Sequence, residues 1–130
     1  MFSFSWVIGS GDGAQGGSTD DVQIEKVLDK VELILDRSGS VTLDVIDGGE
    51  LGPESLQVET ESGKSVISLG ENTNDDYVVR TFTSRSVHDE KVLILGNEWD
   101  SKLVCEDSAL VKAIVKEFLS TGNVSRDVLS

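Results

Sequence analysis

One stretch of this sequence matches a known binding motif. The run "IGSGDGAQGGSTDD" follows an apolar segment, and its glycines fit the spacing G-x-G-x-x-G at Gly11, Gly13 and Gly16. In that motif a helix begins inside the glycine loop, so that its free backbone N–H groups bind a pyrophosphate. Here the residue types that cap helices lie at 18–21, after the last glycine. We therefore interpret the loop as an exposed, flexible connector and not as a nucleotide site.

The single histidine has the partners of a hydrolytic relay close by in sequence. Ser84 or Ser86 would be the nucleophile, His88 the base and Asp89 the acid. Neighbours in sequence rarely reach the geometry that such a relay requires, because its three groups must converge on one reacting atom. We interpret His88 as a solvent-facing turn residue. The sequence predicts no catalytic residue, and it indicates a protein that is not an enzyme.

Metal-binding patterns are equally sparse. One histidine and one cysteine do not make a zinc site, and the acidic runs "NTNDD" and "DVIDGGE" lack the ligand register of a calcium loop. We expect Cys105 to be a small buried hydrophobe, since the adjacent Glu106 and Asp107 disfavour a thiolate. Trp6 and Trp99 are expected at the core, at its edge or in an interface. No metal and no cofactor are predicted.

Acidic charge is the most unusual feature of the composition. The 130 residues include 24 acidic and 11 basic side chains, which gives a formal net charge of −13. Residues 1–76 hold 16 acids against four bases, whereas residues 77–130 are nearly balanced. Such a field repels nucleic acid and anionic lipid, and it speeds encounters with basic proteins. We therefore expect neither a nucleic-acid nor a membrane partner, although solubility alone also accounts for an acidic composition.

The length favours a single domain, 1–130, with one hydrophobic core. The longest apolar runs are too short to cross a bilayer, and the N-terminus lacks the pattern of a signal peptide. One cysteine permits no internal disulfide and suits a reducing compartment. These observations together predict a cytoplasmic protein.

Hydrophobic periodicity predicts the elements of the N-terminal half. Alternation over 2–8 indicates a strand with one buried face, and apolar residues from Ile24 to Leu35 recur at helical spacing. We expect that helix to start at caps within 18–21 and to stop with Gly39 in the left-handed conformation. From residue 40 the period is two. A strand at 40–47, a loop containing Pro53 and a hairpin about Ser62–Gly63 follow.

The C-terminal half reads as further strands and a second helix. Strands are predicted within 77–86 and 91–99, and the run "VLIL" at 92–95 indicates a central strand covered on both faces. A short strand within 101–107 precedes a helix that Asp107 or Ser108 caps and Gly122 ends. Residues 123–130 are expected to be extended or frayed.

These elements follow the order β-α-β-β-β-β-β-(β)-α. The prediction is an α+β domain, with a curved, mainly antiparallel sheet of about five to seven strands. An N-terminal and a C-terminal helix pack on this sheet.

The segment "EWDSKLVCEDSALVKAIVKEFLSTGNVS" resembles the closing part of small immunity proteins from bacterial toxin–immunity systems, including contact-dependent growth inhibition. In that layout a short strand leads to the cap Glu106–Asp107–Ser108 and then to an amphipathic helix ending in "VKEFLSTG". The resemblance implies a cytoplasmic protein that binds a cognate toxin domain and performs no chemistry itself. Partner-binding surfaces vary among such proteins, so the resemblance carries over no contact residue.

Charge independently suggests where a partner binds. Many such toxins are nucleases, whose clefts are basic because they hold phosphate, and an acidic inhibitor is captured quickly by such a cleft. The hypothesis places the contact in Asp44–Glu61, which contains six carboxylates and no Lys or Arg, with two neighbouring acids. The candidate residues are Asp44, Asp47, Glu50, Glu54, Glu59, Glu61, Asp75 and Asp76.

Two other functions remain open from the sequence. The first is a non-catalytic adaptor or secretion chaperone, which a neighbouring toxin gene would argue against. The second is a small-ligand binder or an enzyme with an unrecognised site, which would need an enclosed cavity with convergent polar groups.

Overall fold

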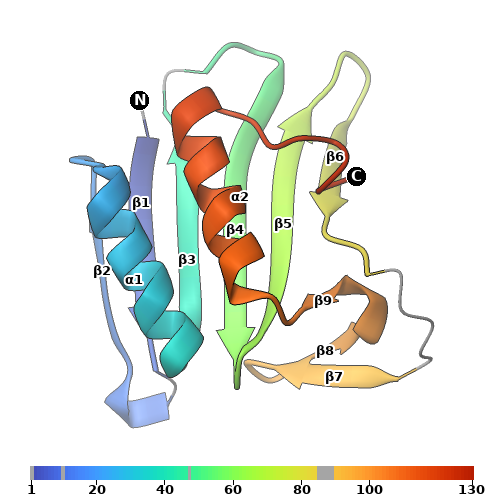
Figure 1. Cartoon of the computed structure of the whole chain (residues 1–130). Helices are drawn as coiled ribbons and strands as arrows, with labels where there is room; N and C mark the ends of the chain where they lie inside the picture. The colour runs from blue at the N-terminus through green and yellow to red at the C-terminus, as the bar shows by residue number, and fades with distance from the viewer. Residues whose placement is uncertain (1, 10, 47, 85–89) are drawn as a thin grey trace.

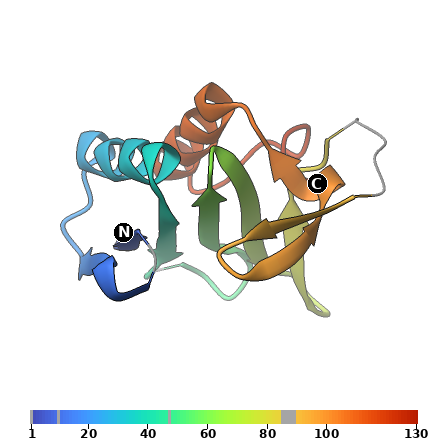
Figure 2. The ribbon, with the colours of Figure 1, turned by 90° about the horizontal axis from the view of Figure 1, so that it is seen from below.

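Seven strands form one antiparallel sheet, and both helices lie on the same side of it (Figures 1 and 2). The structure is a computed structural model that describes residues 2–9, 11–46, 48–84 and 90–130. The sheet order is β2-β1-β3-β4-β5-β6, and β9 pairs with β5. The described fold is therefore α+β with a mainly antiparallel sheet, as the sequence predicts.

The sheet strands are β1 (Phe2–Ile8), β2 (Gln15–Thr19), β3 (Ser38–Val45), β4 (Gly52–Glu61), β5 (Lys64–Asn72), β6 (Tyr77–Thr81) and β9 (Val104–Cys105). A separate hairpin contains β7 (Lys91–Ile94) and β8 (Asn97–Asp100). The helices are α1 (Ile24–Asp36) and α2 (Ser108–Thr121), and the short 3-10 turns are η1 (Gly11–Gly13) and η2 (Ser101–Leu103).

The core lies between the helices and one face of the sheet. Alternation along each strand directs its apolar side chains to that face, and the helices complete the layer with their apolar stripes. Fully buried members include Leu43, Leu56, Ile67, Leu69, Val31, Ile34, Ile114 and Phe118. The opposite face is polar: one row of cross-strand neighbours consists of Ser18, Ser5, Thr42, Gln57, Ser68 and Thr81.

The glycine segment is more ordered than the sequence predicts. Its second half is the edge strand β2, whose Gly16 and Gly17 pair with Val7 and Trp6. A side chain at Gly17 would meet the Trp6 ring. The interpretation of this segment as a flexible connector is therefore wrong for β2. Gly16 and Gly17 have no side chains, so this edge strand can lie directly against Trp6.

Both predicted ends of α1 need correction. The helix begins after Gln23, which makes no side-chain capping bond, because residues 18 and 19 are engaged in β2. At the other end, Arg37 donates its backbone N–H to the Leu33 carbonyl. Gly39 lies inside β3 at a φ of 142°, where any Cβ would collide with the Val7 carbonyl oxygen. Its glycine requirement comes from strand packing and not from a helix cap.

The hairpin predicted about Ser62–Gly63 is confirmed. Both turn residues have positive φ values, 53° and 76°, as a tight two-residue hairpin requires. β4 is longer than predicted, since Pro53 belongs to it and is not in the preceding loop. The β4–β5 register shifts between Pro53 and Ser55, which accommodates a residue that has no N–H to donate.

The prediction of a central strand at 92–95 is wrong. Leu95 and Gly96 adopt positive φ values of 51° and 84°, so the chain reverses there and β7 pairs only with β8. Leu93 is 58% exposed. The hairpin instead packs on the opposite side of the sheet from the main core, where Ile94 joins Val66 and Val104 in a second apolar cluster. An unbroken apolar run hides the turn because Leu rarely occupies a left-handed position.

The second helix agrees with its prediction, but the tail does not. The Asp107 carboxylate accepts a hydrogen bond from the Leu110 N–H, and Gly122 ends α2 in the left-handed conformation. The prediction that residues 123–130 are frayed is wrong, because Val124 and Leu129 are buried in the main core. The guanidinium of Arg80, only 3% exposed, fixes the tail by donating to the carbonyls of both residues at 2.6 and 3.0 Å.

Candidate functional site

Five predicted contact residues gather at one end of the sheet, where the β3–β4 connection and the β5–β6 turn lie together at the top of Figure 1. We call this set the acidic end: Asp44, Glu50, Glu54, Asp75 and Asp76. All five side chains are exposed, and none of them forms an ion pair within the described parts of the chain.

Hydrogen bonds hold this end together. The Asn72 amide donates to a Glu54 carboxylate oxygen at 3.2 Å, which joins β4 to β5. In the next turn, the Thr73 N–H and hydroxyl both donate to the Asp76 carbonyl, at 2.8 and 2.9 Å. The Asp76 carboxylate in turn accepts from the Tyr77 N–H at 2.8 Å. These contacts fix the carboxylates of Glu54 and Asp76 relative to the sheet.

Exposed apolar side chains accompany the carboxylates. Ile46, Leu51 and Tyr77 are 47%, 55% and 49% exposed. Ile46 and Asn72 line the same small cavity of about 140 Å³, and Asn72 pairs with Tyr77 across β5 and β6. Large exposed apolar groups with a charged rim are typical of protein-binding surfaces.

The remaining predicted contact residues do not join the acidic end. Glu59 and Glu61 lie toward the other end of β4, where Glu61 pairs with Ser38 and Lys64. Glu59 is half-buried, and this burial raises the pKa of its carboxyl group above the usual value. One of its oxygens is buried without a hydrogen-bond partner. Asp47 lies outside the described residues.

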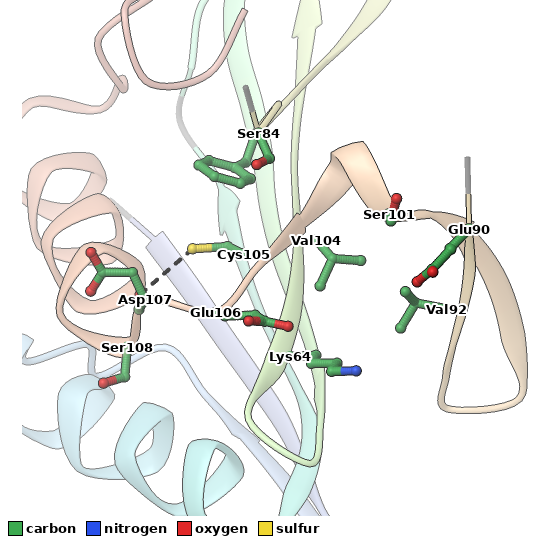
Figure 3. A pocket seen from close by; sticks show the side chains of 11 residues that line it. Lys64, Ser84, Glu90, Val92, Ser101, Val104, Cys105, Glu106, Asp107 and Ser108 are labelled. Carbon is green, nitrogen blue, oxygen red and sulfur yellow. Dashed lines mark hydrogen bonds between the residues drawn. The ribbon is translucent and has the colours of Figure 1, made fainter. Parts of the chain in front are cut away.

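A second candidate site is a cavity of about 800 Å³ between β9, the start of α2 and the β7–β8 hairpin (Figure 3). Its lining is mostly polar: it includes the acidic residues Glu90, Glu106 and Asp107 and, among the described residues, one cation, Lys64. Ser84 lines it as well, whereas Ser86, His88 and Asp89 lie outside the described residues. The interpretation of His88 as a solvent-facing turn residue therefore falls outside the described residues, as do three of the four residues of the relay that the sequence analysis rejected.

Cys105 is buried, as predicted, although it lines the same cavity. Its thiol contacts the Asp107 carbonyl oxygen at 3.6 Å, and Figure 3 shows this contact as a dashed line. Burial raises the pKa of the thiol, and the charges of Asp107 and Glu106 raise it further. A high pKa disfavours the thiolate, so this geometry does not activate Cys105 as a nucleophile.

Other candidate ligands remain apart. No group of three or more His, Cys, Asp or Glu side chains is arranged to hold a metal ion among the described residues. No helix in the described ranges is long and apolar enough to span a membrane. Trp99 packs against the second apolar cluster. Trp6 packs against the main core and stacks on Phe4, with the Lys30 ammonium 4.9 Å from its ring centroid.

A family model describes nearly the whole chain. It matches residues 5–128 and is that of the family of unknown function DUF6911. The chain belongs to this family. A crystal structure of a hypothetical protein from Neisseria gonorrhoeae has the same fold, with a TM-score of 0.77 over 95% of this chain and 90% of that one. The two sequences are 14% identical, so this likeness concerns the fold alone.

A lactaldehyde dehydrogenase from Methanococcus vannielii is 37% identical over 67 residues. The match includes 47% of this chain but only 14% of the dehydrogenase. A segment of that size does not carry the dehydrogenase activity over to this chain.

Sequence reasoning missed the apolar part of the acidic end. It selected residues by charge, it placed Ile46 near the end of a strand at 40–47, and it placed Leu51 in the loop containing Pro53. The available signal was the presence of Ile46 and Leu51 inside a loop otherwise rich in Gly and acids. Tyr77, the first residue of β6, also precedes two valines with no intervening polar residue.

Proposed function

We propose that this protein binds a basic protein partner through its acidic end, and that the partner is a toxin domain which the binding neutralises. One observation carries the proposal. Five exposed carboxylates without ion pairs in the described structure lie at the same end of the sheet as the exposed apolar side chains of Ile46, Leu51 and Tyr77. The apolar groups supply area that loses water on contact, and the carboxylates select a positive partner.

The net charge of the whole chain also favours a basic partner. A net charge of −13 attracts a basic surface over a Debye length, which is about 8 Å at physiological salt. Fast capture is useful for an inhibitor whose target damages the cell that makes it. A nuclease toxin fits this requirement because its cleft is positively charged. The resemblance of the C-terminal segment to immunity proteins agrees with this assignment.

The test compares three baits that differ only in where charge is removed. The first is the native chain. The acidic-end variant contains Glu50→Gln, Glu54→Gln, Asp75→Asn and Asp76→Asn. The control variant removes four exposed carboxylates from η1 and α1, by Asp12→Asn, Glu25→Gln, Asp29→Asn and Asp36→Asn. Both variants lose four negative charges, so a difference between them reports position and not net charge.

Each bait is used for capture from its producing strain, and a captured partner is then expressed alone and with each variant. We expect the native and control baits to retain the same basic partner, the acidic-end variant to lose it, and growth to be rescued by the first two alone. Equal retention by both variants would contradict the placement. A captured partner that does not arrest growth when expressed alone would favour the adaptor function. If the native bait captures no partner from cells that express the toxin, the immunity function is wrong.

A further inference from the structure

We infer that the free edge of β6 accepts an extended, basic segment of the partner as an additional antiparallel strand. The inference rests on the proposed function for the charge of the partner, but it names a different contact. The acidic end attracts the partner through side chains, whereas the edge would bind it through main-chain hydrogen bonds.

β6 is the last strand of the sheet order on one side (Figure 1). Its inward backbone groups face β5, where Arg80 pairs with Leu69 and Val78 pairs with Glu71. The Phe82 N–H donates inward as well, to Ile67. Since backbone groups alternate along a strand, those of the odd-numbered residues face outward. Thr81 confirms the alternation, because its N–H and carbonyl both bond to Ser130 at 3.2 Å.

The C-terminal tail therefore occupies only the lower part of this edge. It pairs with Thr81, and Leu129 forms an antiparallel bridge with Phe82. Above that point no described segment pairs with the outer side of Tyr77–Val79. The Val79 N–H and carbonyl are left facing outward. We call this stretch the β6 edge. The tail contact shows that an antiparallel segment pairs with the outer side of the neighbouring Thr81.

Along Tyr77–Val79 the β6 edge carries no lysine, proline or bulge, which are among the features that protect strand edges. β6 has the sequence YVVRT, and its one charged residue, Arg80, is buried beneath the tail. Val79 is 57% exposed and Tyr77 is 49% exposed. The opposite edge strand, β2, has the sequence QGGST and offers no large apolar side chain.

Charge selects the occupant of this edge. Asp75 and Asp76 lie in the turn that enters β6, and the acidic end continues through Glu54 on the neighbouring hairpin. An incoming strand with alternating apolar and basic side chains would place its apolar side chains beside Val79 on one face of the sheet, and its basic side chains would reach Asp75 and Asp76 where the strand passes the turn. A second copy of this chain would bring another charge of −13 against the first, which disfavours self-pairing.

Proline at Val79 provides the sharpest test. It removes the outward N–H while leaving every inward bond to β5 in place, and edge positions of this kind tolerate proline. Val79→Thr is the matched control, since it replaces one methyl group by a hydroxyl of similar size and keeps the N–H. The probe is a blocked peptide of alternating lysine and valine, about nine residues long. Binding is followed at low salt by amide chemical shifts and by hydrogen exchange of the native chain.

We expect the peptide to shift the β6 amides and to slow exchange of the Val79 amide. Val79→Pro should weaken binding at least tenfold, and Val79→Thr should weaken it less than threefold. If Val79→Pro does not fold, protection of the Val79 amide in the native chain decides the question. Absence of that protection, or undiminished binding by a folded Val79→Pro variant, would overturn the inference.

Two further outcomes separate this inference from the proposed function. Loss of peptide binding in the acidic-end variant but not in Val79→Pro would support the charged contact at the acidic end. It would contradict strand addition at the β6 edge. Sedimentation velocity tests for pairing between two copies of this chain. A dimer of the native chain that is absent in Val79→Pro would show that a second copy binds the β6 edge, and it would contradict binding of a basic partner segment there.

Discussion

Replacing Arg80 by methionine should destabilise this protein more than any change at the surface. The guanidinium donates to the Leu129 and Val124 carbonyls and to the Asn123 side chain at 3.0, 2.6 and 2.9 Å, and it lies 3.6 Å from Glu71. Methionine keeps most of the aliphatic volume but removes all the donors. Breaking a buried ionic contact of this kind lowers the unfolding free energy by about 3–5 kcal/mol. That is a large part of the roughly 5–15 kcal/mol that stabilises a typical domain.

Urea unfolding followed by circular dichroism measures this loss, with Arg126→Met as the control. Arg126 bonds the same Glu71 carboxylate at 3.2 Å, but its side chain is 68% exposed. Its loss should therefore change the unfolding free energy by less than about 1 kcal/mol. Adding Glu71→Gln to the Arg80→Met variant should recover part of the stability, because it removes a buried negative charge that would have only the exposed Arg126 as its partner. A loss below about 1 kcal/mol for Arg80→Met would refute the role of this arginine in fixing the tail.

Three further changes test other parts of the structure. Glu59→Gln should stabilise the fold at pH 7 but not below pH 4. Burial raises the pKa of this carboxyl, so the folded state holds the proton more tightly and native stability falls as pH rises through the raised pKa; a pH series of urea midpoints measures this. Gly39→Ala should destabilise the protein by roughly 1–3 kcal/mol, since its Cβ meets the Val7 carbonyl at a positive φ; thermal unfolding checks the loss. Cys105 should react slowly with a thiol reagent in the native state and rapidly in urea, because burial raises its pKa.

Local pattern was sufficient for most of the sheet. Period-two alternation identifies β3 and the β4–β5 hairpin, because each strand has one face in the core and one in water. Ser62–Gly63 is a turn that the residue types themselves favour. The Asp107 cap and Gly122 likewise bound α2 by chemistry that operates within a few residues. These features need no information from distant parts of the chain.

Most of the failures depend on contacts between distant segments. Residues 123–130 are polar enough to look frayed, and only the buried Arg80 reveals why Val124 and Leu129 are held in the core. β2 forms because glycines allow it to lie against Trp6. The turn at Leu95 is an exception, because its signal is local: Gly96–Asn97 follows the apolar run, but the run was interpreted as part of a single strand. The acidic end was predicted in part, because charge is visible in the sequence. The sequence did not show that Glu59 and Glu61 lie at the other end of β4, because the length of that strand was not predicted.

The most direct test of the central claim is the association rate constant between this protein and the basic partner captured by the native bait, measured at low and high salt. We expect the acidic-end variant to associate at least tenfold more slowly at low salt and with a weaker salt dependence, while the control variant stays within about twofold of the native chain. Equal rates for the two variants would contradict it, because they have the same net charge and differ only in where the carboxylates were removed.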